Sequence, residues 1–436
     1  MKTGEHWLEG CIVDLFTLRP VHPAFESLAP GSGFGAGVGF DSKPNAGRVE
    51  SNISLKTVAS VDGSFSMGGS YTLAFPGLSI SARQSSSGSP PASCTASSDR
   101  PECHPYIRRL SLHAGDPEMD AKAALTFRAQ HLQLNRQDYY GQGQFTSQSG
   151  WSTYSLRSNT VGMTFGDPFA SWLSPSVAVD YLEPDIGGTT GEPRPSITSL
   201  YTASTTPGLA LRPRFVRTEP QVWVRFQVPP NFATGKVSLV PDVTHVTLGY
   251  AFFHDFEKDQ ATFRQLHGFA QTSFEILILT GKTGANRGTL SKLICPARPA
   301  TECSLGKLFL TADAVLSYTS SGSLVPFYFQ PSLGGVDFQG EDTLRGFRDY
   351  RFRAPDRVFY QAEFRHELGK LPMGLLAFYD VGRVGNDASE LSSHLRHDTG
   401  TGLYVTVANM VLLRLYVGFG TGEGIRPNLK FANGAF

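Results

Sequence analysis

The sequence contains no apolar run of the ~18 to 20 residues that a transmembrane helix requires. It is also poor in charge: only 17% of its 436 residues are Asp, Glu, Lys or Arg, and the formal net charge is zero. This balance lacks the basic footprint of a nucleic-acid binder, so we expect no nucleic-acid partner. The 46 glycines and 31 phenylalanines suit a large β structure. Membrane-spanning strands remain compatible with this composition, because lipid-facing and lumen-facing side chains alternate along them.

Motifs for catalysis are missing as well. The chain has no Gly-x-Ser-x-Gly nucleophile elbow, and the glycine repeat at 33–39 is not followed by the helix pattern that a nucleotide-binding loop needs. His394 and His397 have a spacing that metal ligands use, but they lie in a polar stretch between predicted strands. We therefore expect no catalytic residue, no metal and no cofactor, and we predict that the protein is not an enzyme.

The N-terminus has no recognisable signal peptide, because Asp14 interrupts its apolar run. Cys11 follows Leu-Glu-Gly, a poor match to a lipoprotein cleavage site. We expect residues 1–30 to be a leader or a truncated linker, and residues 31–436 to be one domain.

Cysteines are few, and four of the five form two close pairs, Cys94 with Cys103 and Cys295 with Cys303. Both pairs lie in segments rich in proline and small polar residues, which is typical of hairpins closed by disulfides in an oxidising compartment. Each closed loop would contribute roughly 2.5 to 3 kcal/mol. A zinc site is the alternative, although the spacing within each pair is wider than zinc ligands usually show.

Alternation with period two dominates the rest of the chain. Gly33, Gly35, Gly37 and Gly39 share one face of a predicted strand, with apolar residues on the other. Residues 49–57 and 65–75 predict a hairpin with one apolar face and one face of Ser, Thr and Gly, which suits a water-filled lumen. Similar patterns recur at 121–134, 150–166, 176–182, 222–228, 243–256, 262–279, 307–320, 358–368, 373–384, 401–407, 412–420 and 429–436, with an ambiguous strand within 197–212.

These patterns amount to about sixteen antiparallel strands, a number typical of a closed transmembrane β-barrel. The fold class that we predict is all-β, a transmembrane antiparallel β-barrel with a long loop folded into its lumen. The loop lies between the strands predicted at 307–320 and 358–368. Its arginines at 345, 348, 351, 353 and 357 need polar partners, which water or a polar lumen would provide.

Three ordered motifs in the last hundred residues resemble the bacterial surface antigen family, the barrel domain of BamA- and TamA-type outer-membrane assembly proteins. Leu344, Arg345, Gly346 and Phe347 are similar to the tip of the family's lumen loop. The segment Phe378–Gly382, of sequence FYDVG, resembles a later strand motif whose aspartate faces the lumen. Residues 429–436 resemble the terminal strand, which ends on an aromatic residue.

The resemblance implies that Asp380 receives Arg345, with Phe378 and Gly382 nearby on the wall. Glu363, on the strand that returns from the loop, is the alternative partner, and a solvated Arg345 is the remaining alternative. A carboxylate matches the planar donors of a guanidinium and fixes its position. Such a pair contributes about 0 to 1 kcal/mol if exposed, whereas removing one partner of a desolvated pair costs about 3 to 5 kcal/mol.

The resemblance also implies a function in inserting or translocating other β-rich chains at the bacterial outer membrane. The partners would be the lipid bilayer, unfolded outer-membrane proteins as clients, and periplasmic accessory proteins. A weak lateral seam would join the first and last strands, with Gly33, Gly35, Gly37, Gly39, Asn433 and Phe436 along it. Two alternatives stay open: a membrane-anchoring barrel of a truncated protein, for example with an upstream hydrolase domain, and a passive pore.

Overall fold

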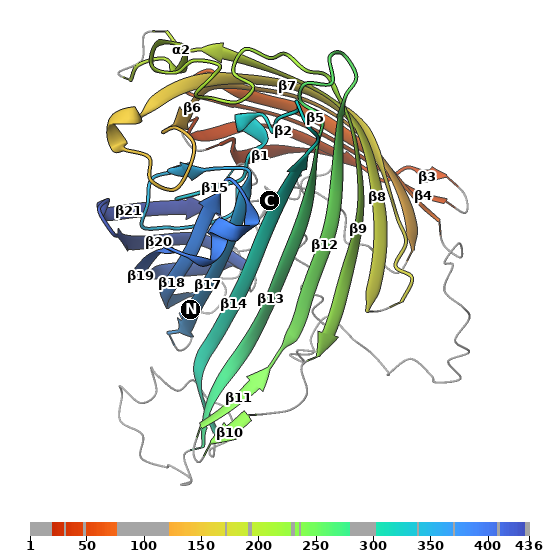
Figure 1. The fold of residues 1–436 in the computed structure, drawn as a ribbon. Coiled ribbons are helices and arrows are strands. Elements are labelled where there is room, and N and C mark those ends of the chain that lie inside the picture. The colour runs from red at the N-terminus through yellow and green to blue at the C-terminus, as the bar shows by residue number, and fades with distance from the viewer. Residues whose placement is uncertain are drawn as a thin grey trace.

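The computed structural model describes residues 20–29, 32–46, 49–75, 122–170, 172–190, 194–227, 232–234, 237–279, 302–337, 340–368, 371–407 and 410–431. Within these ranges the protein is built almost entirely of β-strands, and no helix there is long and apolar enough to cross a membrane. Figure 1 shows one large, strongly curved sheet.

Sixteen main strands follow one another as antiparallel neighbours, each pairing with the next in the chain order of this set. They are β1 (Val21–Ser27), β2 (Phe34–Ser42), β4 (Val49–Ser60), β5 (Phe65–Phe75), β6 (Ala123–Tyr139), β7 (Ser152–Gly166), β8 (Leu173–Gly188), β9 (Phe215–Gln227), β12 (Val243–Asp255), β13 (Phe263–Leu279), β14 (Glu302–Thr319), β17 (Asp356–Glu367), β18 (Met373–Gly385), β19 (Arg396–Val407), β20 (Met410–Gly420) and β21 (Gly424–Phe431).

Short elements decorate this sheet. β3 (Asn45–Ala46), β10 (Phe232–Thr234) and β11 (Val237–Pro241) extend it, and β15 (Ser332–Leu333) pairs with β16 (Phe352–Arg353) in a separate ribbon. The helical segments are single turns: η2 (Gln148–Gly150), α2 (Ile197–Leu200), η3 (Phe327–Phe329) and η4 (Ala388–Ser392).

The outer face of the sheet is apolar and exposed, the reverse of a soluble β-sandwich. On β7, Val161 and Met163 are 57% and 45% exposed, whereas Gly162 and Thr164 alternate with them on the other face. Exposed apolar side chains in this alternation are what lipid-facing strands require. The predicted number of strands and their antiparallel order are confirmed.

Three details differ from the sequence predictions. The segment 197–212 holds α2 and a series of turns where an ambiguous strand was expected. The last described strand is β21, which begins at Gly424, ahead of the predicted 429–436. The sheet begins at Val21, inside the predicted leader, because β1 pairs with β2 along all seven of its residues. Pro23 had obscured this strand, and proline is tolerated at such a sheet edge.

The described ladder ends at β1 on one side and β21 on the other. β1 pairs with β2, β21 pairs with β20, and no ladder within the described ranges joins the two end strands. Two apolar clusters lie inside the curved sheet, one next to β6–β8 and one next to β9–β13. The turn η3 belongs to both, through Phe327 and Phe329. The segment between β14 and β17 therefore lies inside the curved sheet.

Candidate functional site

The segment between β14 and β17, residues 320–355, is called the lumen loop below. Its tip is shaped by two glycines with positive φ, Gly334 at 113° and Gly335 at 56°. A Cβ on Gly334 would lie 2.2 Å from the carbonyl oxygen of Arg348, and one on Gly335 would lie 1.9 Å from Oδ1 of Asp349. Glycine is thus needed at both positions, and the turn directs the next ten residues back toward the wall.

Arg345 lies at the end of this tip and is 1% exposed. Its Nε and Nη2 donate to Oδ2 and Oδ1 of Asp380 on β18, both at 2.8 Å. Its Nη1 donates to Glu363 on β17. The two carboxylates that the sequence offered as alternatives therefore bind Arg345 together. Desolvated and bidentate, this arrangement is of the kind whose disruption is costly.

Aromatic rings enclose the same guanidinium. The Arg345 Cζ lies 3.6 Å from the centre of the Phe378 ring and 5.9 Å from that of Tyr416. The two rings meet edge to face, with centroids 5.5 Å apart. Phe378 and Asp380 share the inward face of β18, whereas Tyr379 between them is 51% exposed on the lipid side. The alternation of one strand thus provides both the ring and the carboxylate.

Gly346 rests directly on the backbone of the wall. Its N–H donates to Oδ2 of Asp398 on β19 at 2.9 Å. A Cβ here would lie 2.6 Å from the backbone nitrogen of Gly420, and one on Gly418 would lie 2.8 Å from the Arg345 carbonyl oxygen. The alternating glycines of β20 therefore form the surface on which the loop tip docks. Sequence reasoning missed Asp398, although its position on an inward face beside glycine-rich strands was a usable signal.

The last two strands hold the loop by a second ion network. Asp342 accepts from Nζ of Lys430 on β21 at 2.9 Å, and Nη1 of Arg414 on β20 lies 3.4 Å away. Nδ2 of Asn428 donates to the Arg345 carbonyl oxygen at 3.3 Å. Burial opposes ionisation of Asp342, but these cations prevail and hold its pKa below the usual value.

The other loop arginines also find partners. Nε of Arg351 donates to Oε1 of Glu423 at 2.6 Å, and its Nη1 donates to Thr146 in the β6–β7 connection at 2.7 Å. Arg348 lies 3.5 Å from the same Glu423. Nη1 of Arg353 donates to the carbonyl oxygen of Phe327 at 2.9 Å. Arg351 and Arg353 are 6% and 1% exposed, so the polar partners of these two arginines are protein groups and not bulk water.

Arg357, at the start of β17, completes the anchoring. Its Nε donates to Oδ1 of Asp313 at 2.9 Å and its Nη1 to Oδ2 of Asp337 at 3.0 Å. Apolar side chains pack beneath this part of the loop: Leu333, Leu344, Phe347, Phe352, Ala354, Phe359 and Val384 form one buried cluster. Gly382 leaves room for it, because a Cβ there would lie 2.9 Å from Leu333.

A second buried carboxylate, Asp180 on β8, was not predicted from the sequence. Nε and Nη2 of Arg128 donate to it at 2.6 to 2.9 Å, and Nε of Arg217 donates to it at 2.9 Å. Arg217 also lies 3.3 Å from Glu219. Arg128 reaches Asp180 across β7, where a Cβ on Gly162 would lie 1.9 Å from Asp180 Oδ1. This cluster ties wall strands to one another.

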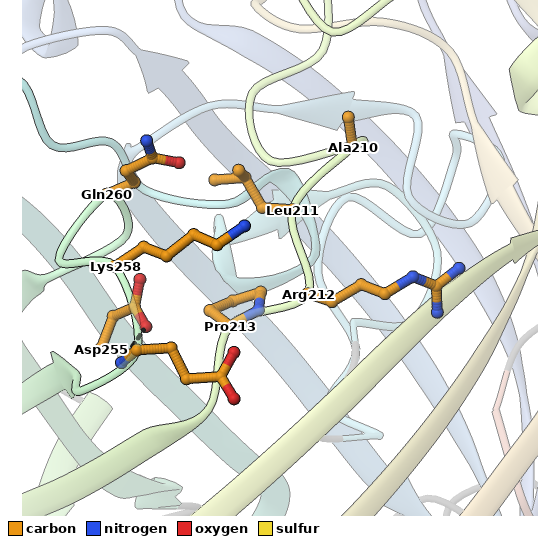
Figure 2. A pocket seen from close by; sticks show the side chains of 8 residues that line it. Ala210, Leu211, Arg212, Pro213, Asp255, Lys258 and Gln260 are labelled. Atoms are coloured by element: carbon orange, nitrogen blue, oxygen red, sulfur yellow. Dashed lines mark hydrogen bonds between the residues drawn. The ribbon is translucent and has the colours of Figure 1, made fainter.

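A cavity of about 190 Å³ opens beside the β12–β13 turn (Figure 2). It is lined by Ala210, Leu211, Arg212, Pro213, Asp255, Glu257, Lys258 and Gln260. Asp255 accepts the backbone N–H groups of Glu257 and Ala261, and Arg212 is paired with Asp185. These two charged groups are therefore engaged in the surrounding structure.

The predicted seam needs correction. Gly33 precedes β2, and Gly35, Gly37 and Gly39 lie within it, paired with β1 on one side and β4 on the other, so they do not form the sheet edge. A Cβ on Gly37 would lie 1.7 Å from the carbonyl oxygen of Thr57, which points to a packing role. Among the described strands, β1 occupies the edge instead. Asn433 and Phe436 lie outside the described residues.

Cys11, Cys94, Cys103 and Cys295 also lie outside them, and Cys303 is in β14 opposite Ile278. The predicted disulfides thus stay predictions. Across the described ranges, no group of three or more His, Cys, Asp or Glu side chains is arranged to hold a metal ion.

No family model matches the chain, and no curated protein matches its sequence. Several solved structures resemble it, including the following two. BamA from Haemophilus ducreyi, in a form lacking POTRA domains 1–3, is similar with a TM-score of 0.50 at 12% identity, covering 94% of this chain and 68% of that one. CdiB from Acinetobacter baumannii has a TM-score of 0.45 at 10% identity, covering 92% and 55%. The chain therefore has the fold of the BamA barrel, and the resemblance drawn from its motifs is confirmed at that level.

Proposed function

We propose that this chain is a bacterial outer-membrane β-barrel that inserts or translocates other β-rich polypeptides. It would use the seam where the two end strands of the sheet, β1 and β21, meet. The role needs no catalytic residue. Its partners would be the lipid bilayer, unfolded outer-membrane proteins and periplasmic accessory proteins. Support comes from the BamA-type fold and, above all, from the two short end strands of the sheet.

These end strands contrast with the middle of the sheet. β1 has seven residues and the described part of β21 has eight, whereas β13 and β14 have 17 and 18 and pair along almost their full length. A shorter ladder has fewer backbone hydrogen bonds to break, so the sheet opens most easily at its ends. Exposed backbone donors and acceptors at an edge can pair with an incoming strand.

Both end strands also present apolar side chains outward. Val21 and Phe25 on β1 are 55% and 38% exposed, and Ile425 and Leu429 on β21 are 69% and 60% exposed. A client strand that pairs at this edge would therefore continue a lipid-facing surface. The lumen loop supports the same role. It contacts the inner face of β17 to β21 and so fixes the position of β21, one of the two end strands.

Site-specific photo-crosslinking tests the proposal. A photoreactive amino acid replaces Phe25, Leu429 or, as a matched control, Leu248 on β12, which is 54% exposed in mid-sheet. The protein is placed in lipid vesicles, and a urea-unfolded small outer-membrane barrel protein is diluted into them. We expect client adducts at Phe25 and Leu429 and a background level at Leu248. Equal labelling at all three sites, or none at the edge positions during insertion, would reject the edge mechanism.

A passive pore is disfavoured by the interior. The lumen loop and the aromatic residues of η3 fill the space beside β6 to β13 with buried side chains. A pore needs a continuous water-filled path, so the intact protein should conduct little.

A further inference from the structure

Asp398 and Asp380 form a pair of carboxyl groups facing each other across the β18–β19 ladder. They are direct cross-strand partners, and directly opposed residues of an antiparallel pair place their side chains next to each other on the same face of the sheet. Asp380 is 0% and Asp398 2% exposed. Two ionised carboxylates this close, away from water, repel strongly, and a shared proton is the usual resolution.

The cation at this site, Arg345, already binds other carboxylate oxygens. Arg345 gives Nε and Nη2 to the two oxygens of Asp380 and Nη1 to Glu363. Asp398 receives the backbone N–H of Gly346 on Oδ2, while its Oδ1 is buried and accepts no donor from the part of the chain that the structure describes. A proton on either carboxyl group would turn the Asp380–Asp398 contact into a hydrogen bond.

The surrounding elements bring further charges, each with a partner of its own. On β17, Nε of Arg365 donates to Glu363 at 2.5 Å. Arg414 of β20 and Lys430 of β21 face Asp342 of the lumen loop. On β19 itself, the guanidinium of Arg396 lies 5.5 Å from the Phe352 ring. Within the described ranges, none of these cations donates a hydrogen bond to Asp398.

We propose that Asp398 holds a proton while the lumen loop is docked, which makes it a pH-sensitive positioning residue for Gly346. Loss of the proton leaves two facing carboxylates on strands whose backbones are fixed by the ladder. The loop tip is the part free to move, so repulsion is relieved by lifting Arg345 and Gly346 from the wall.

The direction of the pH effect follows from proton binding. The docked state binds one proton more than the undocked state, whose carboxyl groups ionise near their ordinary value of about 4. Docking therefore weakens as the pH rises through the range in which only the docked state keeps the proton, and it levels off above it. If Asp398 were ionised in the docked state, docking would not weaken over this pH range.

Hydrogen exchange of the Arg345–Phe347 amides measures docking directly. The full chain is held in detergent micelles between about pH 5 and about pH 9, and each rate is divided by the intrinsic rate at that pH. We expect protection in the native protein to fall by ~10-fold or more across this range. Docking is measured without a client, so the outcome is independent of the insertion activity proposed above.

Asp398→Asn is the decisive variant, because asparagine keeps an acceptor for Gly346 without a titratable proton. It should protect the loop tip at low pH within ~3-fold of the native protein and show no decline at high pH. Asp180→Asn, which removes a buried carboxylate that joins wall strands through Arg128 and Arg217, should keep the native pH profile. Two results would overturn the proposal: a native profile that is flat with pH, or an unchanged decline in Asp398→Asn. Heat-modifiable migration in gels confirms that each variant is folded.

Discussion

Two buried aspartates, Asp380 and Asp180, are each bound by guanidinium groups, but they join different parts of the molecule. Asp380 connects the lumen loop to β18 through Arg345. Asp180 connects β8 to β6 and β9 through Arg128 and Arg217. Around Asp180 the backbone ladder already joins the strands. Around Asp380 the ion pair and its neighbours make the main connection between the lumen loop and the inner face of the sheet.

This difference separates two uses of a buried charge. The Asp180 cluster reinforces contacts that the backbone makes anyway, so its loss should weaken the wall without changing its shape. The Asp380 site fixes a segment that has no ladder with the main sheet, so its loss should release the loop. Stability and loop position can therefore be perturbed separately, which the following predictions use.

Arg345→Ala should have the largest effect. It leaves Asp380 and Glu363 buried without their common cation, and we expect the free energy of unfolding in urea to fall by about 3 to 5 kcal/mol. Single-channel conductance in planar bilayers should rise from small, flickering currents as the loop leaves the lumen. Arg264→Ala is the control, since Arg264 lies on the outer surface against Phe252. An unchanged conductance in Arg345→Ala would show that the loop does not obstruct the lumen.

Asp180→Asn should come next, with a loss of about 3 kcal/mol in the free energy of unfolding, because a hydrogen-bonded charge is removed from a buried cluster. Arg217 keeps Glu219 as a partner, which limits the cost. Conductance should stay at the native level, since the lumen loop is untouched. A rise in conductance as large as that of Arg345→Ala would show that the two sites do not differ in their effect on the lumen loop.

Gly346→Ala should cost about 1 to 2 kcal/mol through overpacking. The added methyl would meet backbone atoms of Gly420 and Phe419, so the loop tip must lift from β20 and conductance should increase modestly. Gly268→Ala is matched to it, because a Cβ there meets its nearest atom, on Leu248, at 3.7 Å. Equal melting temperatures for the two alanine variants would contradict close packing of the tip.

The smallest effect is the pH dependence contributed by Asp342. Its pKa is lowered in the folded protein, so its stabilisation is present above the unfolded value of about 4 and is lost as the pH falls through the folded value. Thermal unfolding between about pH 5 and about pH 2 should therefore decline less steeply in Asp342→Asn than in the native protein. If the melting temperatures of Asp342→Asn and the native protein declined equally with falling pH, Lys430 and Arg414 would not stabilise the ionised form of Asp342.

The sequence predicted the Arg345 site because its residues are neighbours in recognisable motifs. Arg345, Gly346 and the segment Phe378–Gly382 each stand in a short, ordered pattern, and the alternation of β18 alone places Phe378 and Asp380 on one face. The strands themselves were predictable for the same reason, since period-two patterns are local. β1 was not predicted, because its seven residues include Pro23 and pair with a described strand, β2, on one side only.

The Asp180 cluster could not be predicted in this way. Arg128, Asp180 and Arg217 stand in three different strands, outside any short motif, and they meet only because the register aligns them across Gly162. Register depends on the pairing of whole strands, which no local pattern determines. The available signal was one charged residue among several in each of three strands, and it required the strand order before it could be used.

The most direct test of whether the lumen loop holds the C-terminal strands is hydrogen exchange in Arg345→Ala, measured strand by strand in micelles. The lumen loop makes hydrogen bonds to β17, β18, β19, β20 and β21, so the amides of β20 and β21 should exchange ~10-fold faster or more, while those of β6 to β9 keep their native rates. Equal acceleration in both groups of strands, or none in either, would contradict the claim that the loop selectively holds the C-terminal wall.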